Sequence, residues 1–324
     1  MPAHSTLARL AQVMTLWIAA CALGWGIAWW PRSHGLAVGG AVAIAMGHSW
    51  VLGVEFLVLC RLRRRDGTPH ASGWQMLRAW WNEAIDGVVV FGWRQPWRWR
   101  AVGDHLDGGE VRGRHGVVFI HGFVCNRGFW TPWLQQLTTD GRAFVAVNLE
   151  PVFTGIDDYV PLVEDAVAKV RDATGLPPVL VCHSMGGLVA RAWLRRRADA
   201  GVPEEAWAHV VTIGSPHAGT WLARFSHLPN GRQMRPDSDW LRGLQQAWSP
   251  AMGRRFTCWH ANCDNIVMPP SSATLPGADN RLVPGAAHVD LAFRPEVLRG
   301  TLDLIAQLDR QATPPAHAPA RTGA

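Results

Sequence analysis

The sequence predicts an α/β protein in which a mostly parallel central sheet carries helices on both faces and is preceded by two transmembrane helices. Two patterns carry this prediction. After about residue 115, short and wholly apolar runs alternate with amphipathic stretches, as expected for strands that helices cover on both sides. Before residue 65, two long segments contain almost no charged residue, which is typical of helices that cross a bilayer.

The composition excludes several classes of protein. Hydrophobic residues make up 48% of the 324 residues and charged residues only 17%. An average soluble chain has ~25% charged residues, so this chain is not mainly disordered, and its long apolar segments are too few for a polytopic transporter. The net charge of +6 would suit nucleic acid or anionic lipid. No recognisable nucleic-acid module accompanies that charge, and we expect no nucleic-acid partner.

The first domain, residues 1–65, is predicted to be a transmembrane helical hairpin. Residues 10–30 contain no charge and would form a helix roughly 31 Å long, close to the hydrocarbon thickness of a bilayer. A second apolar segment covers residues 36–60, interrupted only by His48 and Glu55. A cleaved secretory signal or lipoprotein leader, and a buried pair of helices, are the alternatives.

Basic residues predict the orientation of this hairpin. Arg residues follow the second apolar segment at positions 61 and 63–65, whereas the turn between the two segments holds only Arg32. Because positively charged flanks stay in the cytoplasm, we expect both ends of the hairpin and everything after it on that side. The predicted location is the bacterial inner (plasma) membrane, with a cytoplasmic catalytic domain.

Residues 66–114 are expected to form a membrane-proximal linker rich in Trp and Arg. Indole and guanidinium groups together favour the headgroup zone of a membrane. The same indole rings could instead cover one face of the catalytic domain. The sequence leaves both interpretations open for the six Trp at positions 74, 80, 81, 93, 97 and 99.

The catalytic domain is predicted over residues 115–310, followed by a disordered tail over 311–324 that is rich in Pro and Ala. Gly175 and Pro177 end one of its amphipathic helices, since neither residue continues a helix well. The expected strands cover residues 117–120, 144–149, 179–182, 210–213 and 256–260, and the expected helices cover residues 156–174, 185–200 and 295–308.

The strongest functional signal is a serine between the third strand and the helix after it. Residues 181–187 read Val-Cys-His-Ser-Met-Gly-Gly, so Ser184 has small residues two positions before and after it. A strand, a tight turn at serine and a helix form a nucleophile elbow, which exposes the hydroxyl above the sheet. Cys182 stands where Gly is usual. We predict Ser184 as the nucleophile and His183 as a pocket-lining residue.

A second signal follows the first strand of the domain. His121, Gly122 and Phe123 form the turn at its end, where the nucleophile-elbow enzymes place one N–H donor for the oxyanion. We therefore predict the backbone N–H groups of Phe123 and Met185 as the oxyanion hole. His121 and Gly122 are candidates for lining the pocket, and a structural hydrogen bond is the preferred role for the His121 side chain.

The remaining members of a catalytic triad should follow in the order serine, acid, histidine. Asp264 follows the fifth predicted strand and His288 comes 24 positions later. We predict Asp264 as the acid and His288 as the base. The alternatives are Asp279 and Asp290 for the acid and His217 for the base; we expect His217 to line the site instead.

At these residues the chain resembles the bacterial lipases and esterases of the α/β-hydrolase superfamily. The resemblance covers roughly residues 115–310, and the hairpin lies outside it. It rests on the turn at 121–123, the serine turn at 183–187, the Gly-Ser-Pro-His-x-Gly-Thr stretch at 214–220, and the stretches around the predicted acid and base. It implies the α/β-hydrolase fold and the cleavage of ester bonds.

An insertion over residues 221–255 precedes the predicted acid. In enzymes similar to this one, such insertions form a lid over the pocket. A short helix around residues 240–248 would then place Trp240 among the pocket-lining side chains. Surface packing without a gating role is the alternative, and the sequence does not decide between them.

Together these signals predict a membrane-anchored serine hydrolase that cleaves carboxylic esters through a Ser-His-Asp triad and an acyl-enzyme. The expected partners are a lipophilic ester substrate and membrane lipid; the oligomeric state stays open. We expect no cofactor and no metal, because Cys and His never cluster at zinc-ligand spacing. An acyltransferase with the same triad and a catalytically silent membrane scaffold are the alternatives.

Overall fold

A central parallel sheet positions the catalytic part of the molecule. The computed structural model describes residues 5–62, 66–108, 111–201 and 206–312. Its sheet has the strand order β2-β1-β3-β4-β5-β6, and every neighbouring pair is parallel. The strands are β1 (Val117–Ile120), β2 (Phe144–Ala146), β3 (Val179–His183), β4 (His209–Ile213), β5 (Phe256–Ala261) and β6 (Asp279–Val283).

The five apolar strands predicted from the sequence are present, although the second ends at Ala146 and not at residue 149, and the sixth strand is new. All residues of β1 to β5 are buried, whereas β6 begins with exposed residues. β6 lies at the edge of the sheet and starts with Asp279, Asn280 and Arg281. An edge strand needs no continuous apolar run, which is why hydrophobic patterning did not reveal it.

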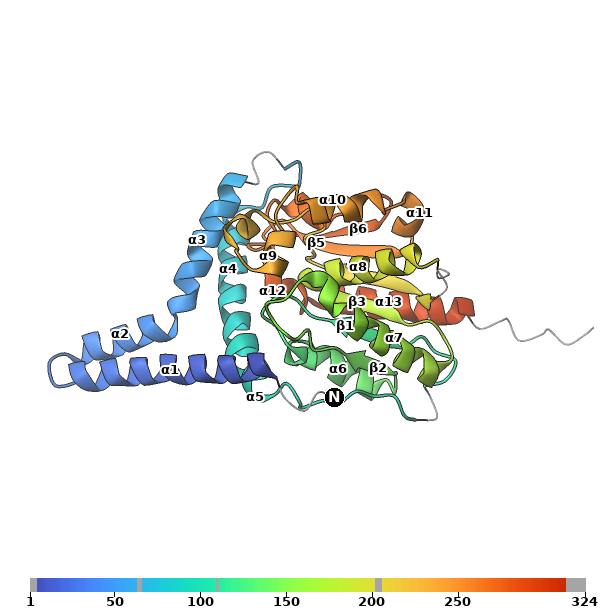
Figure 1. The fold of residues 1–324 in the computed structure, drawn as a ribbon. Helices are drawn as coiled ribbons and strands as arrows, with labels where there is room; N and C mark the ends of the chain where they lie inside the picture. The colour runs from blue at the N-terminus through green and yellow to red at the C-terminus, as the bar shows by residue number, and fades with distance from the viewer. Residues whose placement is uncertain (1–4, 63–65, 109–110, 202–205, 313–324) are drawn as a thin grey trace, which may run out of the picture.

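Alternate residues of the strands face two hydrophobic cores. Val118 and Ile120 pack on one face with α7 (Val160–Thr174), α8 (Met185–Asp199) and α10 (Asp239–Gln246). Val117 and Phe119 pack on the other with α6 (Thr131–Thr139) and α13 (Pro295–Ala312). Helices therefore cover both faces, as predicted (Figure 1).

The remaining short helices connect these layers. They are η3 (Arg127–Trp130), η4 (Ile156–Tyr159), η6 (Trp221–Phe225), α9 (Pro229–Gln233), α11 (Pro250–Gly253), η7 (Pro270–Ala273) and α12 (His288–Leu291). The predicted tail lies outside the described residues, apart from residues 311 and 312, which are helical and end α13.

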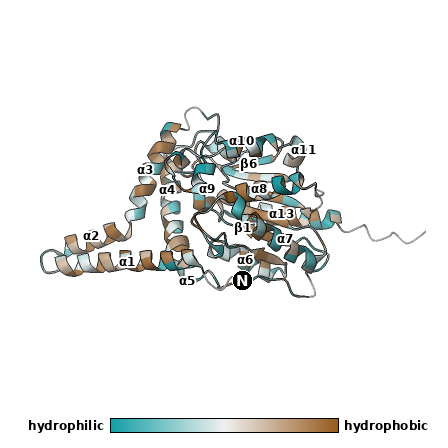
Figure 2. Ribbon diagram, viewed as in Figure 1, coloured by the Kyte–Doolittle hydropathy of each residue, from teal (hydrophilic) through white to brown (hydrophobic). Residues whose placement is uncertain are grey.

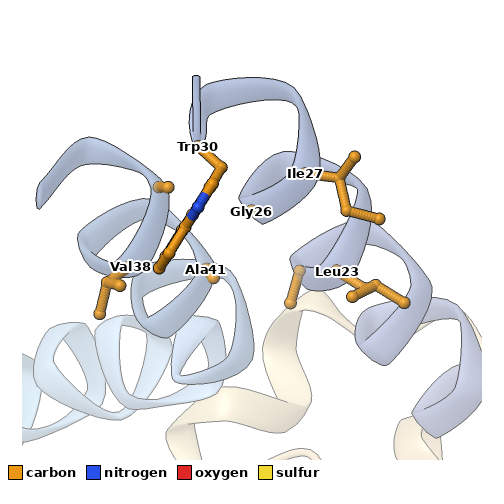
Figure 3. Close-up of a pocket in the computed structure, with 8 residues that line it drawn as sticks. Leu23, Gly26, Ile27, Trp30, Val38 and Ala41 are labelled. Carbon is orange, nitrogen blue, oxygen red and sulfur yellow. The ribbon is translucent and has the colours of Figure 1, made fainter. Parts of the chain in front are cut away.

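Two apolar helices project from this domain (Figure 1). They are α1 (Thr6–Trp29) and α2 (His34–Ala45), and Figure 2 colours them mostly as hydrophobic. Toward their far end, Leu23, Ile27 and Trp30, together with Val38 and Ala41 of α2, line an apolar hollow of ≈ 390 Å³ (Figure 3).

The predicted second span is not one straight helix. It breaks at Met46 into α2 and α3 (Gly47–Leu62), which are bent by 58° relative to each other. Within the described residues, α1 alone is a single helix long and apolar enough to span a bilayer, and α2 and α3 pass the same test only as a bent pair. The polar residues of α3 explain the bend, because His48 Nε2 hydrogen-bonds the Ala84 carbonyl at 2.9 Å and Glu55 accepts a hydrogen bond from Asn265 at 2.7 Å.

The segment expected as a linker is largely helical and docked on the domain. It contains α4 (Gly73–Gly87), the π-helix η2 (Val88–Arg94) and α5 (Gln95–Trp97). Ser72 and Gln75 cap the start of α4 reciprocally. The buried face of α4 includes Met76, Ala79 and Glu83, so this segment contributes side chains to the folded domain as well as connecting it to the hairpin.

Candidate active site

Ser184 lies in the turn between β3 and α8 in a strained backbone conformation. Its φ of 53° and ψ of −127° are unfavourable for any residue with a side chain. The close approach of strand and helix explains the two glycines after it. A Cβ at Gly186 would lie 2.3 Å from the Ile120 carbonyl oxygen, and one at Gly187 would lie 2.3 Å from Ser215 Oγ. This is the geometry of a nucleophile elbow.

The turn after β1 lies directly against this serine. A Cβ at Gly122 would lie only 2.8 Å from Ser184 Cβ, so the position accepts Gly alone without a shift. The backbone of Phe123 is thereby held next to the serine. Met185 is the first residue of α8, where a backbone N–H has no partner within the helix. The two predicted oxyanion donors thus come from segments that meet at Ser184.

Asp264 and His288 form a buried hydrogen-bonded pair. His288 Nδ1 lies 3.0 Å from each carboxylate oxygen of Asp264, and Asp264 Oδ1 also accepts from the N–H groups of Ile266 and Val267 at 2.9 and 2.8 Å. A Cβ at Gly214 would lie 3.1 Å from Asp264 Oδ2. The loop after β4 therefore passes so close to the pair that a larger residue would crowd it.

The charges around His288 favour its protonated form. Burial lowers the pKa of His288, but the charge of Asp264 and its hydrogen bond to the ring outweigh that effect. The net result is a pKa above the ordinary value of histidine. An imidazole held by a carboxylate in this way can accept a proton readily, as a general base must.

His183 connects the serine turn to the histidine loop. Its Nε2 donates to the His288 carbonyl at 3.2 Å, and its ring lies 4.7 Å from the His288 ring and stacks on Phe129 at 4.3 Å. Burial places the pKa of His183 well below its usual value, so the ring is neutral. It therefore links the strand end that carries the Ser184 turn to the loop that carries His288, without adding a charge.

His121 has the structural role expected for its side chain. Its Nδ1 donates to the Gly122 carbonyl at 2.9 Å, and its Nε2 accepts from the Leu149 N–H at 3.0 Å. Burial lowers the pKa of His121 to about 4. The neutral ring fixes the turn that carries Phe123, and both of its nitrogens are occupied.

Two predicted pocket-lining residues have other partners. The His217 ring hydrogen-bonds Thr212 Oγ1 at 3.1 Å and lies 3.9 Å from Cys258 Sγ, inside the core between β4 and β5. Trp240 donates its indole N–H to Asp157 Oδ2 at 2.6 Å. These partners give both rings structural contacts, whereas the sequence indicated only that their segments lie near the site.

The alternative acids pair with arginines. Asp279 on β6 forms an ion pair with Arg281 at 2.6 Å, and Asp290 forms one with Arg294 at 2.6 Å. Neither aspartate takes the place of Asp264 beside His288. Among the described residues, no group of three or more His, Cys, Asp or Glu is arranged to hold a metal ion.

Sequence reasoning missed three polar residues that support the histidine. Asn265 accepts from the His288 N–H at 3.2 Å and donates to Glu55 Oε2 at 2.7 Å. Glu83 on α4 accepts from the Val289 N–H at 2.9 and 3.0 Å and from the Asp290 N–H at 3.1 Å. Glu55 and Glu83 stand out in the sequence only as carboxylates within an apolar and a Trp-rich segment, and Asn265 only as the neighbour of the predicted acid.

The fold and the site together define an α/β hydrolase. The model of the alpha/beta hydrolase family matches residues 117–323, and the chain belongs to that family. No curated protein matches the chain significantly in sequence. Solved structures with low sequence identity to this chain share the same fold.

Two lipase structures illustrate that similarity. The mature form of the Bacillus licheniformis lipase BlEst2 is 16% identical with a TM-score of 0.52, over 61% of this chain and 96% of that one. Aspergillus fumigatus lipase B is 16% identical with a TM-score of 0.53, over 61% of this chain and 55% of that one. The match to the family model begins at Val117, so the apolar N-terminal helices lie outside the residues that it covers.

Proposed function

We propose that this protein is a membrane-attached serine hydrolase that cleaves carboxylic esters of lipophilic acids. The observation that carries the proposal is the Asp264–His288 pair beside the strained turn of Ser184, with both hydrogen bonds of the pair at 3.0 Å. In this arrangement the carboxylate holds the imidazole so that its other nitrogen can take a proton.

The proposed reaction has two steps. Ser184 Oγ attacks the acyl carbonyl carbon while His288 Nε2 takes the hydroxyl proton, and the N–H groups of Phe123 and Met185 bind the oxyanion. The C–O bond to the alcohol then breaks, and His288 returns its proton to the leaving alcohol. Water attacks the acyl-enzyme by the same route and releases the acid and free Ser184.

The Ser184→Ala variant tests this function. We expect hydrolysis of p-nitrophenyl esters by the full-length protein to fall on the order of 10⁶-fold, because the nucleophile is lost. Covalent labelling by a fluorophosphonate should disappear with it. Ser249→Ala is a matched control, since Ser249 caps α11 outside the site, and it should keep both activities.

Three results would bear on the alternatives. Hydrolysis retained in Ser184→Ala would refute the assignment of the nucleophile. A wild-type protein that neither hydrolyses esters nor reacts with the fluorophosphonate would favour a silent scaffold. Transfer of the acyl group to added alcohols, in preference to water, would identify an acyltransferase with the same site.

Membrane attachment is supported by the surface of the N-terminal helices. Only 6% of the apolar window in α1 is buried, and Trp17 and Leu23 are 70% and 66% exposed. An apolar surface of this extent is unfavourable in water and marks contact with lipid or another apolar partner. We infer two membrane passages, by α1 and by the bent α2–α3 pair, with the catalytic domain on the cytoplasmic side.

A further inference from the structure

An apolar cavity lies where the N-terminal helices meet the catalytic domain. Its volume is ≈ 440 Å³, within the range of about 300–1,000 Å³ typical of small-molecule sites. Its walls come from α1, the α2–α3 bend, α4 and η2, and one residue of α12. Representative lining residues are Met14, Ile18, Val51, Phe91 and Val289.

The cavity reaches the loop that carries the predicted base. Val289 lines it and follows His288 directly in α12. Glu83 also lines it, and its carboxylate accepts the Val289 and Asp290 N–H groups. One wall of the cavity is therefore built from the same residues that position His288.

The polar side chains of the lining already have partners within the protein. They are Thr15, His48 and Glu83. Thr15 Oγ1 donates to the Ala11 carbonyl at 2.8 Å and His48 Nε2 bonds the Ala84 carbonyl at 2.9 Å, while Glu83 accepts from α12. A polar ligand would therefore find few free hydrogen-bonding groups in this cavity. A hydrocarbon chain needs no hydrogen bonds and would bury apolar surface against the lining.

The rim of the cavity continues into the exposed apolar surface of the same helices. Met14, Val51 and Val88 line the cavity and are 56%, 61% and 47% exposed. Met14 lies on α1, the helix that is long and apolar enough to span a bilayer. An acyl chain in the surrounding leaflet could therefore enter the cavity without crossing water.

We propose that this cavity binds one acyl chain of a membrane lipid and holds it against the α12 loop beside His288. The inference rests on the proposed ester hydrolase function and extends it, because it makes a long-chain membrane lipid the substrate class. All the lining residues except Val289 come from helices that precede residues 117–323, the region matched by the hydrolase family.

Photo-crosslinking tests the site without needing activity. Full-length Ser184→Ala protein is placed in phospholipid nanodiscs that contain a phosphatidylcholine with a diazirine on one acyl chain, and labelled peptides are mapped after irradiation. We expect labels on residues 14–18, 45–52 and 87–92. Labels confined to lipid-facing positions away from the cavity would overturn the proposal.

Gly92→Leu is the matched blocking variant. A Cβ at Gly92 has only Val88 Cγ1 near it, at 3.9 Å, and Gly92 lines the cavity, so the new side chain can fill the space. Labelling within the cavity should fall about tenfold, because the leucine displaces several buried methylene groups. Gly24→Leu is the control: it lies on α1 with nothing within 4 Å, and labelling should be unchanged.

An activity measurement separates this proposal from the hydrolase function. In the protein that keeps the native Ser184, Gly92→Leu should raise KM for a long-chain ester. The same substitution should leave KM for a short-chain ester unchanged. If the wild type hydrolyses both esters and Gly92→Leu changes neither, the cavity proposal is wrong and the hydrolase function stands. If the cavity is labelled but no ester is cleaved, the binding site stands and the hydrolase function is wrong.

Discussion

The Glu83 carboxyl lies at the N-terminus of α12, the short helix that begins at His288. It is 3% exposed and accepts from the N–H groups of Val289 and Asp290, two groups that no residue within the helix can satisfy. Burial raises the pKa of Glu83 to about 8, although the charge of His288 and these two N–H bonds act in the opposite direction. The group is therefore mostly protonated at neutral pH.

This raised pKa makes stability depend on pH in a defined direction. Between the ordinary value of 4.5 and about 8, the folded protein holds a proton that the unfolded chain lacks, so the Glu83 contribution falls as pH rises. Gln does not titrate. We expect the stability of Glu83→Gln relative to wild type to increase from pH 5 to pH 8 and to level off above that, as measured by thermal unfolding.

Glu83→Ala is the companion variant for the capping role. It removes the acceptor itself and should cost about 1 kcal/mol of stability, as the loss of a helix cap does, and it should lower kcat by displacing His288. Glu83→Gln keeps an acceptor and should retain most of kcat. If the stability difference between Glu83→Gln and the wild type stays constant over this pH range, the pKa of Glu83 is not raised.

These residues show where reasoning from sequence stops. Ser184 follows β3 directly and Asp264 lies shortly after the end of β5, so local patterns place both at one sheet edge. Glu83 and Asn265 depend on contacts between positions more than 200 residues apart in sequence. A local sequence pattern does not reveal such a long-range contact. The role of a carboxylate in a helix depends on the residues that pack against it in the folded chain.

At the scale of elements, the insertion between β4 and β5 folds onto α8. Leu241 and Leu244 of α10 are buried in the same core as Leu188 and Val189 of α8. Trp240 donates to Asp157 of η4 at 2.6 Å. These contacts favour the packing interpretation of α10 over a lid, because the apolar face of the helix is already covered.

Trp240→Phe tests this interpretation. It removes the hydrogen bond to Asp157 and keeps the aromatic packing, so we expect a loss of about 1 kcal/mol in the free energy of unfolding. The preference among esters of different chain length should stay as in the wild type. A changed preference or a changed kcat at unchanged stability would show that α10 covers the substrate.

The bend between α2 and α3 is the clearest departure from the predicted elements. Hydropathy along residues 36–60 predicts one continuous span. It averages the apolar character of the residues and takes no account of the hydrogen bonds that the polar ones form. The structure bends the chain because Glu55 and His48 bind Asn265 and the Ala84 carbonyl. The same carboxylate that sequence reasoning left without a role thus ties α3 to the loop of the predicted acid.

At the scale of the whole molecule, both ends of the hairpin return to the catalytic domain. Ser5 Oγ donates to Glu150 at 2.7 Å and Gln12 Nε2 donates to the Pro96 carbonyl at 2.7 Å, while α3 packs along α4 (Figure 1). A single passage would separate the start of α1 from the domain by a bilayer and break these contacts. In the topology proposed above, the hairpin therefore enters and leaves the membrane on the same side.

The length of α1 indicates how far the turn reaches. Residues 12–29 extend roughly 27 Å at 1.5 Å per residue, close to the ~30 Å hydrocarbon core of a bilayer. The turn that follows contains Arg32, whose guanidinium lies 5.9 Å from the Trp29 ring, and His34, which packs against Trp30. Such side chains are unfavourable in hydrocarbon and suit a headgroup zone. We infer that the turn reaches the opposite membrane surface.

Cysteine accessibility tests this topology. Gly35→Cys places a thiol at the turn, where a Cβ has only Ser33 Oγ within 4 Å, and His70→Cys places one at an exposed position after α3. In intact spheroplasts an impermeant maleimide should label Gly35→Cys above the background of the native cysteines. It should label His70→Cys only after permeabilisation, because the flanking arginines keep that side in the cytoplasm. The reverse pattern would invert the orientation, and labelling of both variants only after permeabilisation would show that the hairpin enters the membrane without crossing it.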